Sequence, residues 1–157
     1  MGDRAKQKSY DRVLSHIREL TAGETDTIAV MATVVCELHH SFDTFDWTGF
    51  YRVVAPGLLK IGPYQGGHGC LQIPFGRGVC GAAARRRRTL VVPDVREFAG
   101  HIACSATTRS EIVVPVIDLA GELMAVLDVD SNELDAFDEV DRVNLEAVCE
   151  MVSGSAS

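Results

Sequence analysis

The sequence contains no long apolar run. None of its 157 residues belong to a stretch long and apolar enough to cross a bilayer. The opening residues MGDRAKQKSYDRV also lack the apolar segment of a secretory signal. We therefore expect a protein of the cytoplasm that associates with no membrane.

The five cysteines, Cys36, Cys70, Cys80, Cys104 and Cys149, never form a Cys-x-x-Cys pair. This absence excludes both a zinc ribbon and a thioredoxin-type motif. An odd number of cysteines in a chain without a secretory signal indicates free thiols in a reducing compartment. Cys36 and Cys149 fall on apolar faces of expected helices, so we expect both in the core.

Positive charge and aromatic residues are also scarce. The formal net charge is −7 and only 6% of the residues are aromatic, so nucleic acids and anionic membranes are poor partners. The run Arg85–Arg88 is basic, but no interleaved aromatic residues support stacking on bases. We expect this run to be solvated at the end of a short helix, where positive charge offsets the helix dipole.

The hydrophobic pattern predicts the fold. Hydrophobic residues make up 46% of the chain, which is enough for one core, and we expect a single domain over 1–157. The apolar period is helical over 5–20 and 24–42, with residues 21–24 (TAGE) resembling a capping box. Strands are expected at 47–54, 58–66 and 70–75, a helix at 76–88, an extended segment at 89–95, a loop at 96–110, a hairpin at 111–118 and 122–131, and a helix at 138–152. Strands joined mostly as hairpins predict an α+β fold, in which helices pack on an antiparallel sheet.

Three carboxyl groups occupy strand positions that the hairpin would bring together. In the strand MAVLDVDS alternate side chains share a face, so Asp128 and Asp130 point the same way as Met124. Pairing around the turn at 119–121 brings Glu111 near both. Like charges that are close and buried raise the pKa of at least one group, which suits proton donation or binding of a substrate ammonium. A strand end running into solvent and a hard metal ion are the alternatives, and we rank the metal below acid catalysis because a thiol lies in the neighbouring loop.

Three of the cysteines lie where regular structure is interrupted. Cys104 is in the polar loop GHIACSATTRSE, Cys70 follows the glycine-rich QGGHG, and Cys80 is near the start of the expected short helix, whose N-terminus can lower a thiol pKa. These positions are compatible with a redox relay, although buried structural thiols are the common alternative. Trp47 and Tyr51 share a strand face and belong either to the core or to the wall of a small pocket.

Several motifs taken together resemble one family. The segments WTGFY, GPYQG, GRGVCG, VPDV, GHIAC, SEIVVP and VLDVDS are similar to those of the free methionine-(R)-sulfoxide reductases, which are single GAF domains. The similarity runs from about residue 40 to about residue 140. The resemblance implies an α/β sandwich with a central six-stranded antiparallel sheet, helices on both sides and a small enclosed pocket. It also implies an oxidoreductase that reduces free L-methionine (R)-sulfoxide and not oxidised protein.

The resemblance further implies roles for individual residues. Cys104 matches the catalytic cysteine, Cys70 the cysteine that resolves it by disulfide formation, and Cys80 a third cysteine that forms an alternative disulfide. The pocket residues that match are the carboxylates Glu111, Asp128 and Asp130, the aromatic wall Trp47 and Tyr51, and the backbone at Ile102 and Ala103. The family implies no bound cofactor and no metal, with thioredoxin as the external reductant.

Two other functions remain as alternatives. One is a non-catalytic GAF module that senses a small molecule such as a cyclic nucleotide, and the other is a redox sensor whose disulfide switches a partner. Thiol alkylation distinguishes the first from an enzyme, because a ligand sensor needs no thiols. The sequence leaves open the oligomeric state, a homodimer included, the physiological reductant, and whether Cys70 or Cys80 is the main resolving thiol.

Overall fold

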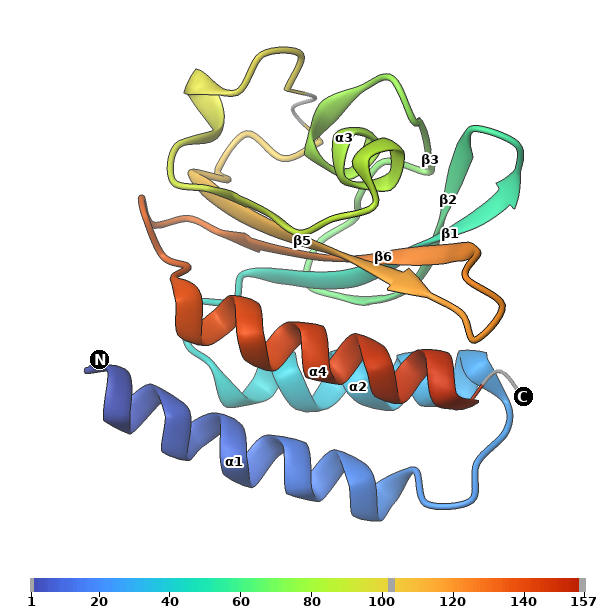
Figure 1. Cartoon of the computed structure of the whole chain (residues 1–157). Helices are drawn as coiled ribbons and strands as arrows, with labels where there is room; N and C mark the ends of the chain where they lie inside the picture. Colours follow the sequence, from blue (N-terminus) through green and yellow to red (C-terminus); the bar gives the residue numbers. More distant parts are fainter. Residues whose placement is uncertain (1, 102–103, 156–157) are drawn as a thin grey trace.

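The computed structural model of the protein describes residues 2–101 and 104–155 and shows one sheet with helices on both faces (Figure 1). The helices are α1 (Asp3–Leu20), α2 (Thr27–Ser41), α3 (Gly78–Arg86) and α4 (Glu139–Ser155), with a short 3₁₀ helix at Val95–Glu97. The strands are β1 (Trp47–Ala55), β2 (Leu58–Gln65), β3 (Gln72–Pro74), β4 (Leu90–Val92), β5 (Ser110–Ile117) and β6 (Leu123–Ser131). None of these helices combines the length and apolar character needed to cross a membrane.

The six strands form one antiparallel sheet in the order β3-β2-β1-β6-β5-β4. The hairpins β1–β2 and β5–β6 supply four of these strands, and β1 pairs with β6 at the centre. The predicted α+β fold with a six-stranded antiparallel sheet is therefore confirmed. Because β6 lies between β1 and β5, residues from all three strands meet on one sheet face.

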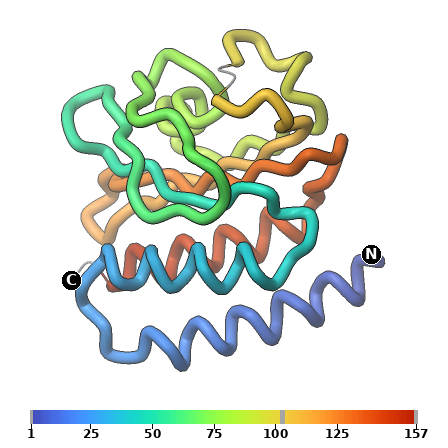
Figure 2. The backbone as a smooth tube through the Cα atoms, turned by 180° about the vertical axis from the view of Figure 1, so that it is seen from behind, coloured from blue at the N-terminus to red at the C-terminus, as the bar shows by residue number. Residues whose placement is uncertain are grey.

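The two faces of the sheet carry different layers. The helices α2 and α4 pack directly on one face, and α1 lies outside them (Figures 1 and 2). Their apolar side chains and the sheet residues Phe50, Ile112 and Leu127 form the larger core, where all three are fully buried. The opposite face is covered by α3 and the loops around it, over a smaller core that includes Trp47, Tyr51 and Cys80. Those predicted functional residues that the structure describes lie on this second side.

The start of α2 differs from the prediction. Asp26 is the N-cap residue, and its side chain accepts hydrogen bonds from the backbone N–H groups of Ile28 (2.9 Å) and Ala29 (3.2 Å). Thr21 instead donates its hydroxyl to the Ile17 carbonyl (2.7 Å) at the end of α1. The predicted capping box at 21–24 is wrong because an aspartate two residues further on satisfies the same free N–H groups.

Two further expectations need correction. Cys36 is half-buried, with its sulfur 3.8 Å from His40 Nδ1, and does not belong to the core, whereas Cys149 is buried as predicted. Met124 packs on the helix side of the sheet and not on the side of Val126. The cause is a register shift next to Val116, which leaves Met124 without a partner on β5 and breaks the strict alternation of side chains.

Candidate active site

The β5–β6 hairpin brings the three carboxyl residues together. Glu111 pairs with Asp130, and Val113 pairs with Asp128, so Glu111 lies near both aspartates as predicted from the sequence. On the other side of β6, Trp47 pairs with Asp130 and Gly49 with Asp128. Alternation along β6 turns Asp128 and Asp130 to the same face, away from the larger core. The three carboxyl groups therefore lie under the layer that contains α3.

These carboxyl groups are held out of water. Glu111 is 6% exposed and Asp128 is 5% exposed, and Oδ1 of Asp128 and of Asp130 are buried without a hydrogen-bond partner among the described residues. Burial raises the pKa of all three groups well above the ordinary carboxyl range. The second cause is mutual repulsion, with the charge of Asp128 acting on Glu111, that of Asp130 on Asp128 and that of Glu111 on Asp130. The cluster is thus suited to hold protons, or to accept a cationic group that pairs with its free oxygens.

Cys80 belongs to the same cluster. The thiol comes from the first turn of α3, and its sulfur and carboxylate oxygens of Glu111 and Asp128 lie within 4.8 Å of one another. Burial, followed by the charges of Asp128 and Glu111, raises the pKa of Cys80 well above its ordinary value. Such a spacing meets the proximity requirement for a metal site, but metal binding needs deprotonated ligands, and the raised pKa values act against that.

An aromatic stack forms another wall. Trp47 lies between Tyr51, at 5.8 Å between ring centroids, and Tyr64 of β2, at 5.4 Å. The indole N–H of Trp47 donates to the Gly67 carbonyl (2.8 Å), which ties the β2–β3 loop to the stack. Gly49 makes this packing possible, since a Cβ there would lie 2.6 Å from Cβ of Tyr64 and collide with the indole. Tyr51 is buried, and burial raises the pKa of its hydroxyl so that it stays protonated.

A disulfide joins the two loops above the carboxyl cluster. Cys70, just before β3, is bonded to Cys104, and their Cα atoms are 5.4 Å apart although 34 positions separate them in sequence. Both cysteines are half-exposed, which leaves the bond accessible from solvent. The prediction that Cys70 begins a strand is wrong, because β3 starts only at Gln72.

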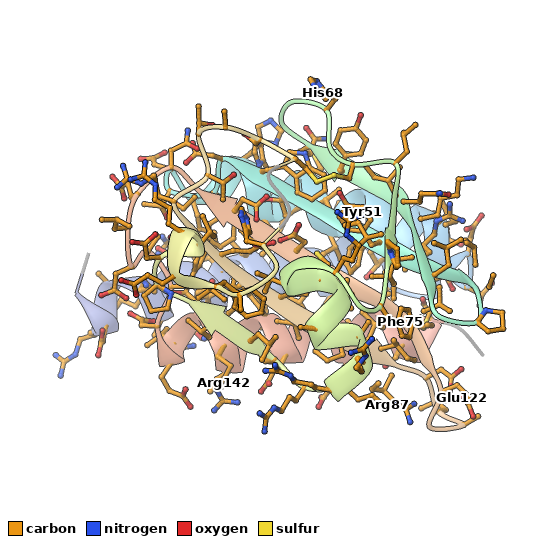
Figure 3. All side chains as sticks on the ribbon, turned by 90° about the horizontal axis from the view of Figure 1, so that it is seen from above. Tyr51, His68, Phe75, Arg87, Glu122 and Arg142 are labelled. Carbon is orange, nitrogen blue, oxygen red and sulfur yellow. A yellow bond between two sulfur atoms is a disulfide. The ribbon has the colours of Figure 1, made fainter. Side chains whose placement is uncertain are left out.

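One cavity of about 270 Å³ lies between these groups. Seven predicted site residues line it: Trp47, Tyr51, Cys80, Cys104, Glu111, Asp128 and Asp130. Cys70 does not line the cavity and reaches it only through its bond to Cys104. Figure 3 shows this face of the molecule, with His68 at the outer end of the β2–β3 loop and Tyr51 nearer the centre. The remaining two predictions, Ile102 and Ala103, lie outside the described residues.

The cavity wall also contains polar residues that were not predicted. Asp46 and Asn132 line it together, and the Asn132 N–H donates to Oδ2 of Asp46 (2.7 Å). The sequence does indicate that Asn132 faces the cavity, because it follows Asp130 by two positions and so continues the strand alternation that places Asp128 and Asp130 on one face. His68, His101, Ser105, Thr107 and Thr108 complete the polar part of the wall. These come from loops, where no periodicity indicates which side chains face inward.

Fold and cavity together define an α+β domain with a disulfide beside a cavity lined by carboxyl groups. The family model described as "GAF domain" matches residues 8–155. The free methionine-R-sulfoxide reductase of Escherichia coli is 37% identical over 140 residues, covering 89% of this chain and 84% of that protein. The enzyme of the same name from Saccharomyces cerevisiae is 35% identical over 156 residues, covering 96% and 87%. An X-ray structure of the Neisseria meningitidis free methionine-R-sulfoxide reductase in complex with its substrate superposes with a TM-score of 0.89 at 41% identity, covering 94% of this chain and 87% of that one. The chain therefore belongs to the GAF-domain family and, within it, to the free methionine-R-sulfoxide reductases.

The buried carboxyl cluster makes folding stability depend on pH. A carboxyl group whose pKa is raised in the folded state holds a proton that the unfolded chain loses at about pH 4 and above. Its contribution to stability is therefore complete below that pH and is lost as the pH rises toward the raised folded pKa. We expect Asp128→Asn to be more stable than the parent at pH 8 by about 2 kcal/mol and to match it more closely at pH 5.

Urea denaturation followed by circular dichroism across this pH range measures the difference. Glu133→Gln is the matched control, because Glu133 is an exposed acidic residue just beyond β6 and its side chain makes no described hydrogen bond. Stability curves for Asp128→Asn and the parent that stay parallel from pH 5 to pH 8 would show that Asp128 is not destabilised by burial.

Proposed function

We propose that the protein reduces free L-methionine (R)-sulfoxide to L-methionine, with Cys104 as the nucleophile. The observation that carries the proposal is that the Cys104 residue and three carboxyl residues line one cavity sized for a single amino acid. The names of the Escherichia coli and Saccharomyces cerevisiae relatives, and the substrate complex of the Neisseria meningitidis enzyme, support the same activity.

The first step removes oxygen from the substrate and oxidises the protein. The Cys104 thiolate attacks the sulfoxide sulfur and forms an S–S bond to the substrate, and the S–O bond breaks as its electrons leave with the oxygen. A bare oxide is a very poor leaving group, so the oxygen takes a proton from the cluster of Glu111, Asp128 and Asp130, whose raised pKa values keep acid protons available. The oxygen leaves as water, and a water molecule then attacks the Cys104 sulfur. The S–S bond to the substrate breaks with its electrons on the methionine sulfur, so that methionine leaves and Cys104 is a sulfenic acid.

The second step forms the disulfide. The Cys70 thiol condenses with the Cys104 sulfenic acid, and water leaves as the S–S bond forms. The observed Cys70–Cys104 bond supports this pairing. Cys80 is less suited to the same role, because burial beside carboxyl groups disfavours its thiolate. No bound cofactor enters this cycle.

The third step returns both thiols. A dithiol protein of the thioredoxin class attacks the half-exposed disulfide, becomes oxidised itself and leaves Cys70 and Cys104 reduced. Each turnover thus consumes one sulfoxide and one dithiol and produces methionine, water and one oxidised dithiol. The cycle requires a compartment that supplies reduced dithiols, and we therefore assign the protein to the cytoplasm.

Substrate selectivity follows from the charge of the cavity. The free ammonium of the amino acid pairs with the carboxylates that are not holding the proton. We expect backbone N–H groups of the segment GHIAC (100–104) to bind the substrate carboxylate. An acylated amine cannot make the ammonium contact and would leave buried carboxylates unpaired, at a cost of several kcal/mol. The aromatic pair Trp47 and Tyr51 encloses the substrate methyl group and selects one sulfoxide epimer by shape.

A turnover assay with a small dithiol such as dithiothreitol tests the proposal. We expect release of methionine from the free (R) epimer, and kcat/KM values at least ~100-fold lower for the (S) epimer and for the N-acetylated (R) sulfoxide. Binding of the sulfoxide without release of methionine by the reduced protein would support the ligand-sensing alternative. Equal turnover of the N-acetylated compound would contradict the role of the carboxyl cluster in binding the ammonium.

A further inference from the structure

One buried thiol of the cavity has no role in the three steps proposed above. Cys80 is 3% exposed and lines the cavity together with Glu111 and Asp128. Its sulfur and one carboxylate oxygen of each of these two residues lie within 4.8 Å of one another. Among the described residues, no other three potential metal ligands lie this close together. We call Cys80, Glu111 and Asp128 the thiol–carboxyl trio.

The surroundings of the trio lack positive charge. Four carboxyl residues line the cavity, and none of the described lining residues is a lysine or an arginine. Oδ1 of Asp128 is buried and has no hydrogen-bond partner in the described part of the chain, and the same holds for Oδ1 of Asp130. Buried polar atoms are paired in the great majority of cases. An unpartnered oxygen on a carboxyl group that is only 5% exposed therefore indicates a ligand that carries positive charge.

Rigid elements hold all three members of the trio. Glu111 and Asp128 belong to the neighbouring strands β5 and β6, and Cys80 lies in the first turn of α3, which packs on both strands (Figure 1). Gly81 allows α3 to approach closely, because a Cβ there would lie 2.6 Å from the Pro74 carbonyl oxygen. Ligand atoms in a tetrahedral zinc site are about 3.5 Å apart. Small side-chain rotations into the cavity are enough to bring the trio to that spacing.

The donor atoms determine which cation fits the trio. A metal must displace the protons of its ligands before it binds, and this requirement disfavours cations of low affinity. Mg²⁺ and Ca²⁺ take six or more oxygen ligands, whereas the trio offers one thiolate and two carboxylates. Thiolate ligands favour Zn²⁺ and the chemically similar Cd²⁺. The trio therefore suits a thiophilic divalent cation, with a fourth position left for water.

We infer that Cys80, Glu111 and Asp128 form a binding site for a thiophilic divalent cation such as Zn²⁺, and that this cation and the substrate exclude each other. The cation is not a cofactor of the proposed cycle, because it occupies the carboxylate oxygens that the substrate ammonium needs. Bound Zn²⁺ therefore inhibits the enzyme. The exclusion of substrate rests on the proposed function, whereas the cation site itself does not.

Metal binding to the oxidised protein tests the site without turnover. The Cys70–Cys104 disulfide removes both loop thiols as ligands and leaves Cys80 as the free thiol on the cavity wall. Cys36→Ser is used as the background, because the Cys36 sulfur lies 3.8 Å from His40 Nδ1 and can itself take up a metal. Cd²⁺ is detected by the ultraviolet charge-transfer absorption of its bond to a thiolate. The affinity for Zn²⁺ is measured by competition with a chromogenic chelator.

Two buried thiols provide a matched pair of variants. Cys80 and Cys149 are each 3% exposed, but only Cys80 belongs to the trio. Loss of an outer partner of a metal ligand already weakens binding by about 10- to 100-fold. Cys80→Ser should therefore weaken Zn²⁺ binding at least ~100-fold and abolish the Cd²⁺ absorption, whereas Cys149→Ser should change neither. Asp128→Asn keeps the thiol in place and should weaken Zn²⁺ binding ~10-fold or more, which gives a second variant if Cys80→Ser does not fold.

The exclusion of substrate is measured on Cys70→Ser/Cys104→Ser, which cannot turn over and retains Cys80 as the cavity thiol. Calorimetry should show that saturating free methionine (R)-sulfoxide weakens Zn²⁺ binding at least ~10-fold, and that Zn²⁺ weakens binding of the sulfoxide by the same factor. The N-acetylated sulfoxide is the control. It has no ammonium and should leave the affinity for Zn²⁺ unchanged.

The outcomes separate the cation site from the proposed function. Equal Zn²⁺ affinities of Cys80→Ser and Cys149→Ser, or Mg²⁺ binding as tight as that of Zn²⁺, would overturn the site. Binding of the sulfoxide that leaves the Zn²⁺ affinity unchanged would overturn the exclusion. A protein that binds Zn²⁺ through Cys80 but neither binds nor reduces the sulfoxide would contradict the proposed function and leave the cation site standing.

Discussion

Replacing Cys104 with serine is expected to reduce turnover of free methionine (R)-sulfoxide by ~10³-fold or more. A serine hydroxyl is far less nucleophilic than a thiolate and cannot form a sulfenic acid. The cavity should still bind the substrate, because Cys104 supplies the reacting sulfur and the carboxyl groups supply the contacts to the ammonium. Methionine release is measured with dithiothreitol, and binding is measured by calorimetry on the reduced protein.

Two other cysteine variants make this result specific. Cys70→Ser should release one methionine per protein molecule and then stop with thioredoxin as reductant, and Cys104 should gain the mass of one oxygen atom. Cys36→Ser, at the half-buried cysteine of α2 on the opposite side of the sheet, should behave like the parent. Substantial turnover by Cys104→Ser, or a burst of methionine from that variant, would remove Cys104 from the mechanism.

Neutralising the carboxyl cluster should have the second largest effect. We expect Glu111→Gln, Asp128→Asn and Asp130→Asn each to lower kcat/KM by ~10²-fold or more, since an amide neither donates an acid proton nor pairs with an ammonium. The kinetic effect of each variant depends on the role of the residue that is replaced. Replacing the proton donor should mainly lower kcat, and replacing a residue that binds the ammonium should mainly raise KM. Steady-state kinetics on the three variants, with Glu133→Gln as the control, assign the roles.

The pH dependence of kcat provides an independent measurement of the donor. A group that must be protonated to act loses activity as the pH rises through its pKa, so the alkaline fall in kcat should reflect the raised carboxyl pKa. Removal of the donor should eliminate that fall and leave a low, flat rate. Unchanged kinetics in all three amide variants would exclude the cluster from the chemistry, even though it lines the cavity.

Much of the fold and part of the cavity could be predicted because they depend on local patterns. The two-residue period of β6 and the turn at 119–121 were enough to predict that Glu111 pairs near Asp128 and Asp130. The common face of Trp47 and Tyr51 likewise followed from their spacing on β1. The prediction that Cys70 pairs with Cys104 came from the family resemblance, because nothing local connects two loops that are 34 positions apart.

The parts that were missed depend on contacts between distant segments or on competition between neighbours. Tyr64 stacks on Trp47 only because Gly49 leaves room between β1 and β2, which no single strand reveals. Asp46 contributes to the cavity wall together with Asn132, to which it is hydrogen-bonded although 86 positions separate the two residues in the sequence. The cap of α2 was misassigned because two candidate caps lie close together, and the difference between them depends on the geometry of the preceding turn.

The aromatic stack has a practical consequence. Trp47 is the only tryptophan of the chain, and its indole forms part of the cavity wall between Tyr51 and Tyr64. Indole emission from this protein, excited selectively over that of its tyrosines, therefore comes from one fluorophore at the site itself. An incoming amino acid, or a change in the sulfur chemistry a few side chains away, can be followed in real time without attaching a dye.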